Sequence, residues 1–181
     1  MDMYKLKFTR LQNGIFRLLC IKSGISLNQR EIARMLGVSP TAVANALPDL
    51  EKEGIIKLVK GKNINLNSVM LDRESEKAVF FKRAENLKML YESGIIQFLY
   101  RQFPGSAAVL FGSYSRGEDT LKSDIDIAVI GSKDKAVELE EFEKKLERSV
   151  SLNFYGSLKV IEKNLRDNIL NGIVLSGGIE L

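Results

Sequence analysis

Two aspartates one residue apart, Asp124 and Asp126, are the side chains in this sequence best suited to chemistry. On a β-strand their carboxylates point to one face, while Ile125 and Ile127 point to the other. Two carboxylates held this close repel each other unless a cation lies between them. Hard oxygen ligands suit Mg²⁺ or Mn²⁺, which also accept water and substrate phosphates. The pair therefore predicts a divalent metal site that serves a phosphorylated substrate.

A Gly-Ser pair, Gly112 and Ser113, precedes these aspartates, with ten residues between Ser113 and Asp124. A glycine that follows an apolar strand lets the backbone approach a phosphate closely. A serine hydroxyl and the backbone N–H groups at a helix start can then hold phosphate oxygens. Arg116 is placed to offset triphosphate charge, and Ser123 directly precedes the first aspartate. Together these residues predict a phosphate-binding turn beside the metal site.

Composition removes the main alternatives for catalysis. The chain has 181 residues and no histidine, which excludes Ser-His-Asp and Cys-His catalysis and every His-ligated metal site. Cys20 is alone among apolar neighbours, so it predicts a packing role and excludes an intrachain disulfide. Any chemistry must therefore run on carboxylates, hydroxyls, Lys, Arg, Tyr and hard metal ions.

A family resemblance rests on these motifs. The segments that carry it are Leu110-Phe111-Gly112-Ser113-Tyr114-Ser115-Arg116-Gly117 and Ser123-Asp124-Ile125-Asp126-Ile127-Ala128-Val129. They resemble the polymerase-β-type nucleotidyltransferase superfamily, and in particular its minimal members, over residues 93–181. The resemblance implies that Asp124 and Asp126 ligate Mg²⁺ and act in catalysis. It also implies that a nucleoside triphosphate, the substrate, is bound by Gly112, Ser113, Arg116 and Ser123.

The sequence departs from that family at the third carboxylate. The matching strand is predicted at residues 150–155, where Ser151 and Asn153 share a face and neither is acidic. Neutral oxygens bind Mg²⁺ more weakly than a carboxylate, so nucleotide binding can survive while transfer becomes slow or absent. Glu138, Glu140 or Glu141 of a helix predicted at 134–149 can be considered as replacements, although solvated surface charge is the preferred interpretation.

The N-terminal third predicts three helices and a hairpin. Phe8, Leu11, Ile15 and Leu18 recur at helical spacing. A second helix is predicted from an N-cap at Asn28 with its partner Glu31, and a third from Ser39-Pro40. Alternation then indicates a hairpin over residues 55–67, with Lys60-Gly61-Lys62-Asn63 at its turn. Residues 8–67 resemble a winged helix-turn-helix, with the clearest matches at 29–39 and 47–56.

Charge distribution agrees with a polyanion meeting this first part. Residues 1–70 carry 11 Lys and Arg against 5 Asp and Glu, whereas residues 105–181 carry 10 against 13. The resemblance implies double-stranded DNA as the partner, although similar three-helix units can serve protein contacts alone. Expected phosphate contacts are Arg30, Arg34, Lys60 and Lys62. Expected contacts at the recognition helix, including base edges, are Ser39, Thr41, Ala44 and Asn45, where Thr41 is alternatively a helix-start hydroxyl.

These predictions define an α+β chain with three parts. Residues 1–70 form the winged helix-turn-helix domain, 71–92 a connecting helix, and 93–181 the nucleotidyltransferase-like domain with a mixed sheet and flanking helices. The connecting helix carries an apolar stripe, which can pack on either domain or pair with a second copy: Phe80, Ala84, Leu87 and Tyr91. No apolar run approaches the roughly 20 residues of a membrane span. We therefore expect no membrane association, and the single cysteine favours the cytoplasm.

Three functions follow as hypotheses. The first is a DNA-binding protein whose second domain binds Mg²⁺ and a nucleoside triphosphate and transfers a nucleotidyl group to a protein or small acceptor. The second is a transcription regulator, because the missing third carboxylate favours an inactive domain used for dimerisation or nucleotide sensing. The third is an antitoxin-like nucleotidyltransferase acting on a HEPN-type ribonuclease partner. A homodimer is expected by analogy with helix-turn-helix proteins that read two half-sites.

Overall fold

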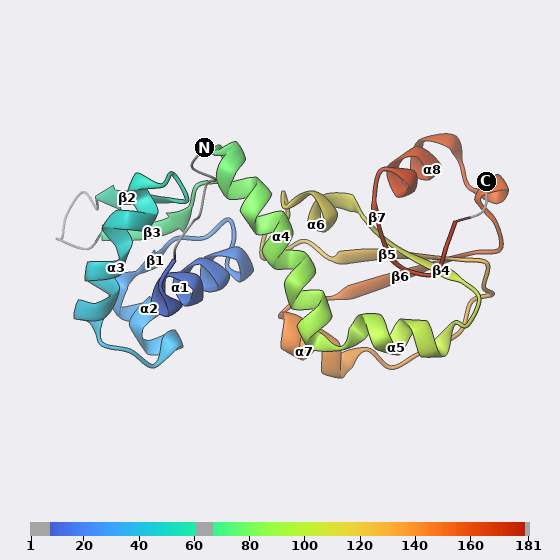
Figure 1. Ribbon diagram of the computed structural model, residues 1–181, viewed down its shortest axis with the longest axis horizontal. Helices are drawn as coiled ribbons and strands as arrows, with labels where there is room; N and C mark the ends of the chain where they lie inside the picture. Colours follow the sequence, from blue (N-terminus) through green and yellow to red (C-terminus); the bar gives the residue numbers. More distant parts are fainter. Residues whose placement is uncertain (1–7, 61–66, 180–181) are drawn as a thin grey trace, which may run out of the picture. The chain divides into compact units, whose positions relative to one another are not determined.

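A computed structural model describes residues 8–60 and 67–179 of the chain. The chain divides into two compact units, Met1–Val79 and Phe80–Leu181 (Figure 1). The fold is α+β, as the sequence predicts, with a helix-turn-helix in the first unit and a mixed sheet in the second. Within the described ranges, no helix is both long and apolar enough to cross a membrane.

Three helices make up most of the first unit, and local side-chain caps set where they begin: α1 (Arg10–Ile21), α2 (Gln29–Leu36) and α3 (Pro40–Lys52). The predicted capping box is present, because the Asn28 side chain accepts from the backbone N–H of Glu31 and the Glu31 carboxylate accepts from that of Asn28. Ser39 caps α3 through one bond alone, with its hydroxyl accepting from the backbone N–H of Ala42. The predicted apolar faces are buried, including Ile15, Ile32, Val43, Leu47 and Leu50.

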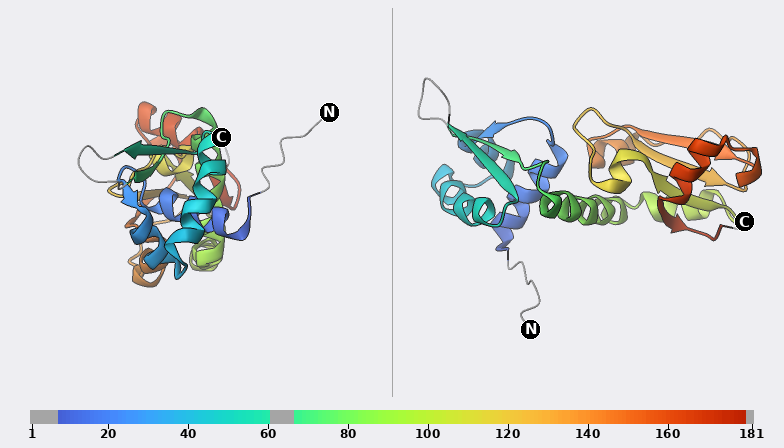
Figure 2. Two further views of the ribbon diagram at one scale, coloured as in Figure 1. Left: turned by 90° about the vertical axis from the view of Figure 1, so that its left-hand side faces the viewer. Right: turned by 90° about the horizontal axis from the view of Figure 1, so that it is seen from above.

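A three-stranded antiparallel sheet completes this unit. Its strands are β1 (Leu27–Asn28), β2 (Ile56–Lys60) and β3 (Asn67–Leu71), in the order β1-β3-β2. Figures 1 and 2 show β2 and β3 lying side by side. The second arm of the hairpin thus runs four residues beyond the predicted end at 67. The alternation at 64–66 that indicated this arm lies outside the described residues.

Helix α4 (Glu76–Ser93) forms the connecting segment, and its buried side differs from the predicted apolar stripe. The predicted apolar stripe faces solvent, since Phe80 is 65% and Tyr91 is 50% exposed. The side that is buried instead carries Ala78, Lys82, Asn86, Met89 and Leu90. Two polar residues therefore lie on the buried face. The exposed stripe is not buried within this chain, and its pairing with a second copy stays a prediction.

The second unit is built around a four-stranded sheet in the order β6-β5-β4-β7. Its elements after α4 are α5 (Ile95–Gln102), β4 (Ala107–Phe111), α6 (Gly112–Arg116), β5 (Ile125–Ile130), α7 (Glu140–Leu146), β6 (Val150–Tyr155), a 3₁₀ turn (Leu158–Val160), α8 (Lys163–Leu170) and β7 (Ile173–Ser176). Strands β5 and β6 are parallel, and the other pairs are antiparallel. The strands predicted at 107–111 and 150–155 are confirmed, and the strand predicted at 124–130 begins one residue later, so that Asp124 directly precedes β5.

The helix predicted over residues 134–149 is shorter than expected. Helix α7 covers only Glu140–Leu146, and Glu147 ends it with a left-handed backbone (φ of 50°). Strand β4 is buried at every position because it lies between β5 and β7 with α8 packed against it (Figure 1). This central position explains its continuous apolar sequence. A hydrophobic core cluster joins Val109 and Phe111 of β4 to Ile161 and Ile169.

Candidate nucleotide and metal site

Gly112 and Asp126 lie in contact at one end of the β4–β5 pair. Phe111, the last residue of β4, is the antiparallel partner of Asp126, so the next residue, Gly112, reaches the aspartate carboxylate. A Cβ atom on residue 112 would lie 2.6 Å from Asp126 Oδ2, and the Gly112 φ is +73°. Only glycine combines this backbone angle with this approach. The predicted proximity of the Gly-Ser turn to the aspartates is therefore a feature of the structure.

The two aspartates also interact with each other. Burial, and in second place the charge of Asp124, raises the pKa of Asp126 above its ordinary value. Ile125 and Ile127 are buried, whereas Asp124 is exposed and Asp126 half-buried, which is the expected alternation along β5. A cation shared by the two carboxylates relieves both the repulsion and the cost of burial. The hard oxygen donors of the two carboxylates therefore fit Mg²⁺ or Mn²⁺.

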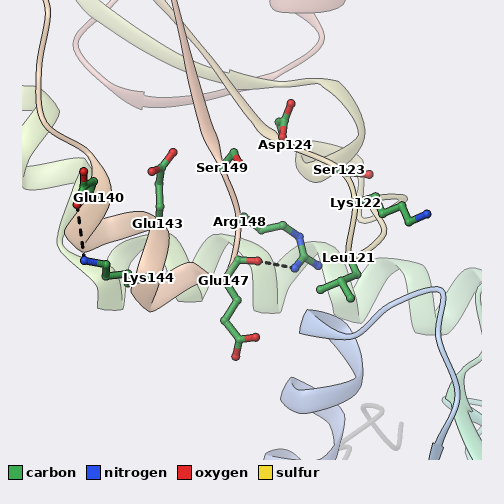
Figure 3. A pocket seen from close by; sticks show the side chains of 10 residues that line it. All are labelled: Leu121, Lys122, Ser123, Asp124, Glu140, Glu143, Lys144, Glu147, Arg148 and Ser149. Atoms are coloured by element: carbon green, nitrogen blue, oxygen red, sulfur yellow. Dashed lines mark hydrogen bonds and ion pairs between the residues drawn. The ribbon is translucent and has the colours of Figure 1, made fainter.

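An open pocket of about 550 Å³ extends from Asp124 toward α7 and the start of β6 (Figure 3). It includes Ser123 and residues that the sequence analysis did not select, including Lys122, Glu143, Arg148 and Ser149. The Glu143 carboxylate accepts a 2.8 Å hydrogen bond from the backbone N–H of Val150, which ties α7 to β6. No sequence signal separated Glu143 from its acidic neighbours. Its position depends on how α7 packs against the strand.

Strand register places Ser151 beside Asp126 in the parallel β5–β6 pair. Residue 151 is thus the position on the neighbouring strand at which a carboxylate is missing. Ser151 Oγ accepts a 3.4 Å hydrogen bond from Asn153 Nδ2. In the described part of the chain, no group of three His, Cys, Asp or Glu residues is arranged to hold a metal. Among the described residues, the structure thus brings together the two predicted aspartates without a third acidic residue arranged to share their metal.

The three glutamates considered as replacements are on or next to α7. Glu140 lines the pocket with Asp124, and its carboxylate lies 3.6 Å from Lys144 Nζ. Glu141 pairs with Lys145 at 2.6 Å, and the hydrogen bond from that lysine lowers the Glu141 pKa. Glu138 is exposed and lines a neighbouring groove. These surroundings agree with the preferred interpretation of solvated charge.

The remaining predicted phosphate contacts have polar partners of their own. Arg116 donates from Nε to Glu118 at 2.8 Å and from an Nη atom to Asn168 of α8 at 3.4 Å. Ser123 Oγ accepts from the backbone N–H of Thr120 at 3.0 Å, which closes the turn before Asp124. Ser113 is half-buried in α6 directly after Gly112. A phosphate bound here would have to draw Arg116 from Glu118.

The candidate DNA-contacting residues lie on α2 and α3. Arg30, Arg34, Thr41 and Asn45 are exposed, and Ala44 is half-buried. Ser39 Oγ accepts from the backbone N–H of Ala42 at 3.1 Å, so this hydroxyl is the N-cap of α3. Of the predicted wing lysines, Lys60 ends β2 with a side chain that is not described, and Lys62 lies outside the described residues.

Comparison with protein families gives each unit a class. Residues 93–179 match the model of the family "Polymerase beta, Nucleotidyltransferase", and residues 10–71 match the Crp-like helix-turn-helix domain. The chain therefore joins an N-terminal helix-turn-helix domain to a nucleotidyltransferase domain of the polymerase-β class. The match agrees with both resemblances found from the sequence.

Solved structures add a weaker likeness. Two single-site variants of Lactococcus lactis ZitR are 26% identical, each covering 57% of this chain and 67% of the other, with TM-scores of 0.42. A double variant of the same protein is 27% identical over 55% of this chain and 64% of the other, also with a TM-score of 0.42. No curated protein sequence matches the chain. The family models, and not these structures, support the domain assignments.

Proposed function

We propose that this chain is a DNA-binding protein whose second domain binds Mg²⁺ and a nucleoside triphosphate and transfers a nucleotidyl group to a protein or small acceptor. The observation that supports this most directly is the contact of Gly112 with Asp126, next to Asp124, within a domain that matches a nucleotidyltransferase family. An exposed helix face bearing Thr41 and Asn45, in a domain of a DNA-binding class, supports the first half of the proposal.

The site residues would have distinct tasks. Asp124 and Asp126 would hold Mg²⁺ or Mn²⁺, which when bound supplies positive charge to the phosphate oxygens. Gly112 lets the backbone of the turn lie against the Asp126 carboxylate, and Ser113 would donate a hydrogen bond from its hydroxyl to a phosphate oxygen. Arg116, on the same turn, would offset the negative charge of the triphosphate. These tasks require a nucleotide at the β4–β5 end of the sheet.

Titration of labelled ATP with Mg²⁺ tests this proposal. Wild type should bind, and the double variant Asp124→Ala/Asp126→Ala should not. A matched control is Asp134→Ala/Asp167→Ala, which removes two exposed aspartates outside the pocket and should bind as wild type does. Absence of wild-type binding, or equal binding by the Asp124→Ala/Asp126→Ala variant, would remove the nucleotide site.

A second function, a transcription regulator with an inactive nucleotidyltransferase domain, is favoured by one observation. Ser151 occupies the position beside Asp126, where a third carboxylate would support transfer. Such a regulator binds an operator and senses nucleotide, but labels no acceptor. An unbiased transfer assay with labelled nucleotides in an extract of the source organism separates the two functions. Mg²⁺-dependent labelling that disappears in Asp126→Ala would exclude the inactive regulator.

A homodimer is part of the proposal because paired helix-turn-helix domains read two half-sites on DNA. The exposed side of α4 carries Phe80 and Tyr91, which offer apolar contact area for a second copy. Light scattering of wild type and Phe80→Glu should show a dimer and a weakened dimer, respectively. Arg83→Glu, an exposed change on the same helix, is the control for altered charge. A wild-type monomer would exclude this part.

A further inference from the structure

Helix α4 carries two fully buried polar residues, Lys82 and Asn86, in the second unit. Both contact one carboxylate, that of Asp119, which is itself buried. The Lys82 ammonium forms an ion pair with Asp119 Oδ1, and Asn86 Nδ2 donates to the same oxygen at 2.7 Å. Arg148 approaches the other oxygen, Oδ2, at 3.6 Å. We call these four residues the Asp119 cluster.

Burying this many polar groups requires compensation. Ionic side chains lose hydration on burial. Only close partners with suitable geometry offset the free-energy cost of that loss. Here the partners come from three separate parts of the unit, namely α4, the segment between α6 and β5, and the residue before Ser149 and β6. None of them belongs to the Gly-Ser or Asp-x-Asp motif. The cluster therefore fixes these three parts relative to one another.

Two of the three parts border the candidate site, and the third, α4, contacts α6. Asp119 lies in the segment that leads to Ser123 and Asp124, and Arg148 lines the same pocket as those two residues. Asn86 also donates to the backbone carbonyl of Tyr114 at 3.0 Å, which holds α6 two residues after Gly112. These hydrogen bonds connect α4 to the segments that carry the two motifs.

We propose that the Asp119 cluster positions the Gly-Ser turn and Asp124 for the nucleotide, with Lys82 and Asn86 as positioning residues. This inference rests on the proposed nucleotide site. Removing the Lys82 charge leaves Asp119 with weaker compensation, so its segment shifts and Asp124 leaves its binding position. Removing the Asn86 amide frees Tyr114 and α6 in the same way, but leaves no unbalanced ion.

Calorimetric titration of Mg²⁺–ATP into the full chain tests the positioning role. Lys82→Met should weaken binding by about tenfold, the scale of a small misplacement of binding groups, and Asn86→Ala by a smaller factor in the same direction. Lys88→Met, at an exposed lysine of the same helix, should leave the Kd unchanged. Lys82→Arg, which keeps a cation beside Asp119, should recover part of the affinity. Circular dichroism confirms that each variant is folded at the titration temperature.

The outcomes separate positioning from simple stabilisation. A purely structural cluster would lower the urea midpoint of folded Lys82→Met and Asn86→Ala but leave their Kd for Mg²⁺–ATP at the wild-type value, which would overturn the inference. Should Lys82→Met fail to fold, Asn86→Ala decides. If wild type itself binds no Mg²⁺–ATP, the proposed function falls and the positioning role falls with it. If wild type binds Mg²⁺–ATP and both variants bind it with the same Kd, only the positioning role is excluded.

Discussion

Gly112 leaves no room for a side chain next to Asp126, because an added Cβ would stand 2.6 Å from the Oδ2 atom of that aspartate. Gly112 is the first residue of the Gly-Ser motif and Asp126 is the last residue of the Asp-x-Asp motif. Antiparallel pairing of β4 with β5 brings them together. The carboxylate of Asp126 therefore packs directly against the backbone of the Gly-Ser turn, with Asp124 two residues before it in the chain.

The substitution Gly112→Ala should disrupt both folding and nucleotide binding. Alanine at the observed φ of +73° costs about 1–2 kcal/mol in folding, and the new methyl group displaces the Asp126 carboxylate. Mg²⁺–ATP affinity should then fall by about tenfold or more. Gly105→Ala is the matched control, since Gly105 has a φ of +79° but no atom within 4 Å of an added Cβ. Urea denaturation should show that both substitutions destabilise the protein to a similar extent. Calorimetry should show loss of Mg²⁺–ATP binding in Gly112→Ala alone.

Asp126 should make the stability of the metal-free protein depend on pH. Its pKa is raised in the folded state by burial and by Asp124, so the folded chain keeps the proton to higher pH than the unfolded chain. Stability contributed by this group therefore falls as pH rises from the ordinary aspartate pKa through the raised value. Asp126→Asn should flatten that slope and raise the urea midpoint at neutral pH in EDTA, whereas Asp134→Asn should not. A lower midpoint for Asp126→Asn at neutral pH would contradict this assignment.

Restoring an acidic residue on β6 should strengthen metal binding. Ser151 is in register with Asp126 on the adjacent parallel strand, so Ser151→Asp adds a third carboxylate on that strand. Mn²⁺ binding measured by electron paramagnetic resonance should tighten by about tenfold, because carboxylates are stronger ligands than hydroxyls for hard cations. Ser151→Asn, of the same shape without the charge, should bind Mn²⁺ as wild type does. Unchanged affinity in Ser151→Asp would place the metal away from β6.

Substitutions of residues that read bases and of residues that contact phosphates should affect DNA binding differently. Asn45→Ala on α3 should cost about 1–3 kcal/mol and relax the preference at one base pair. Arg34→Ala on α2 should weaken binding to all sequences, with the slope of log K against log salt reduced by about one. Gln97→Ala, at an exposed residue of α5, is the neutral control. Fluorescence anisotropy with selected and scrambled duplexes at several salt concentrations measures both effects, and equal losses on the two duplexes for Asn45→Ala would exclude base reading.

Features set by neighbours in the chain were predictable from the sequence. Asn28 with Glu31 predicted a helix start, and Ser39 predicted another, because capping hydrogen bonds span only three residues. The same locality applies to Asp124 and Asp126, since the alternation of a strand alone sets their common face. The Gly-Ser turn also required only that its strand pair with the next one along the chain.

Features set by distant partners were not predictable in this way. The stripe containing Phe80 and Tyr91 was selected by apolar spacing, yet the buried face of α4 is decided by Asp119, 37 positions from Lys82. Likewise, α7 is shorter than its charge pattern indicated, and β7 pairs with β4 from the far end of the domain. Apolar periodicity shows which residues can share one face of a helix. It does not show which face packs against a polar partner.

By itself, the sequence determined the two domain classes, the spacing of the aspartate pair and the start points of the second and third helices. These depend on residue type and on separations of a few positions. The tertiary structure decided that Ser151 stands beside Asp126, that Glu143 and Arg148 enter the pocket, and that Lys82 is buried. Each of these results from strand register or helix packing between segments far apart in the chain, where the balance of desolvation against new contacts selects the partner.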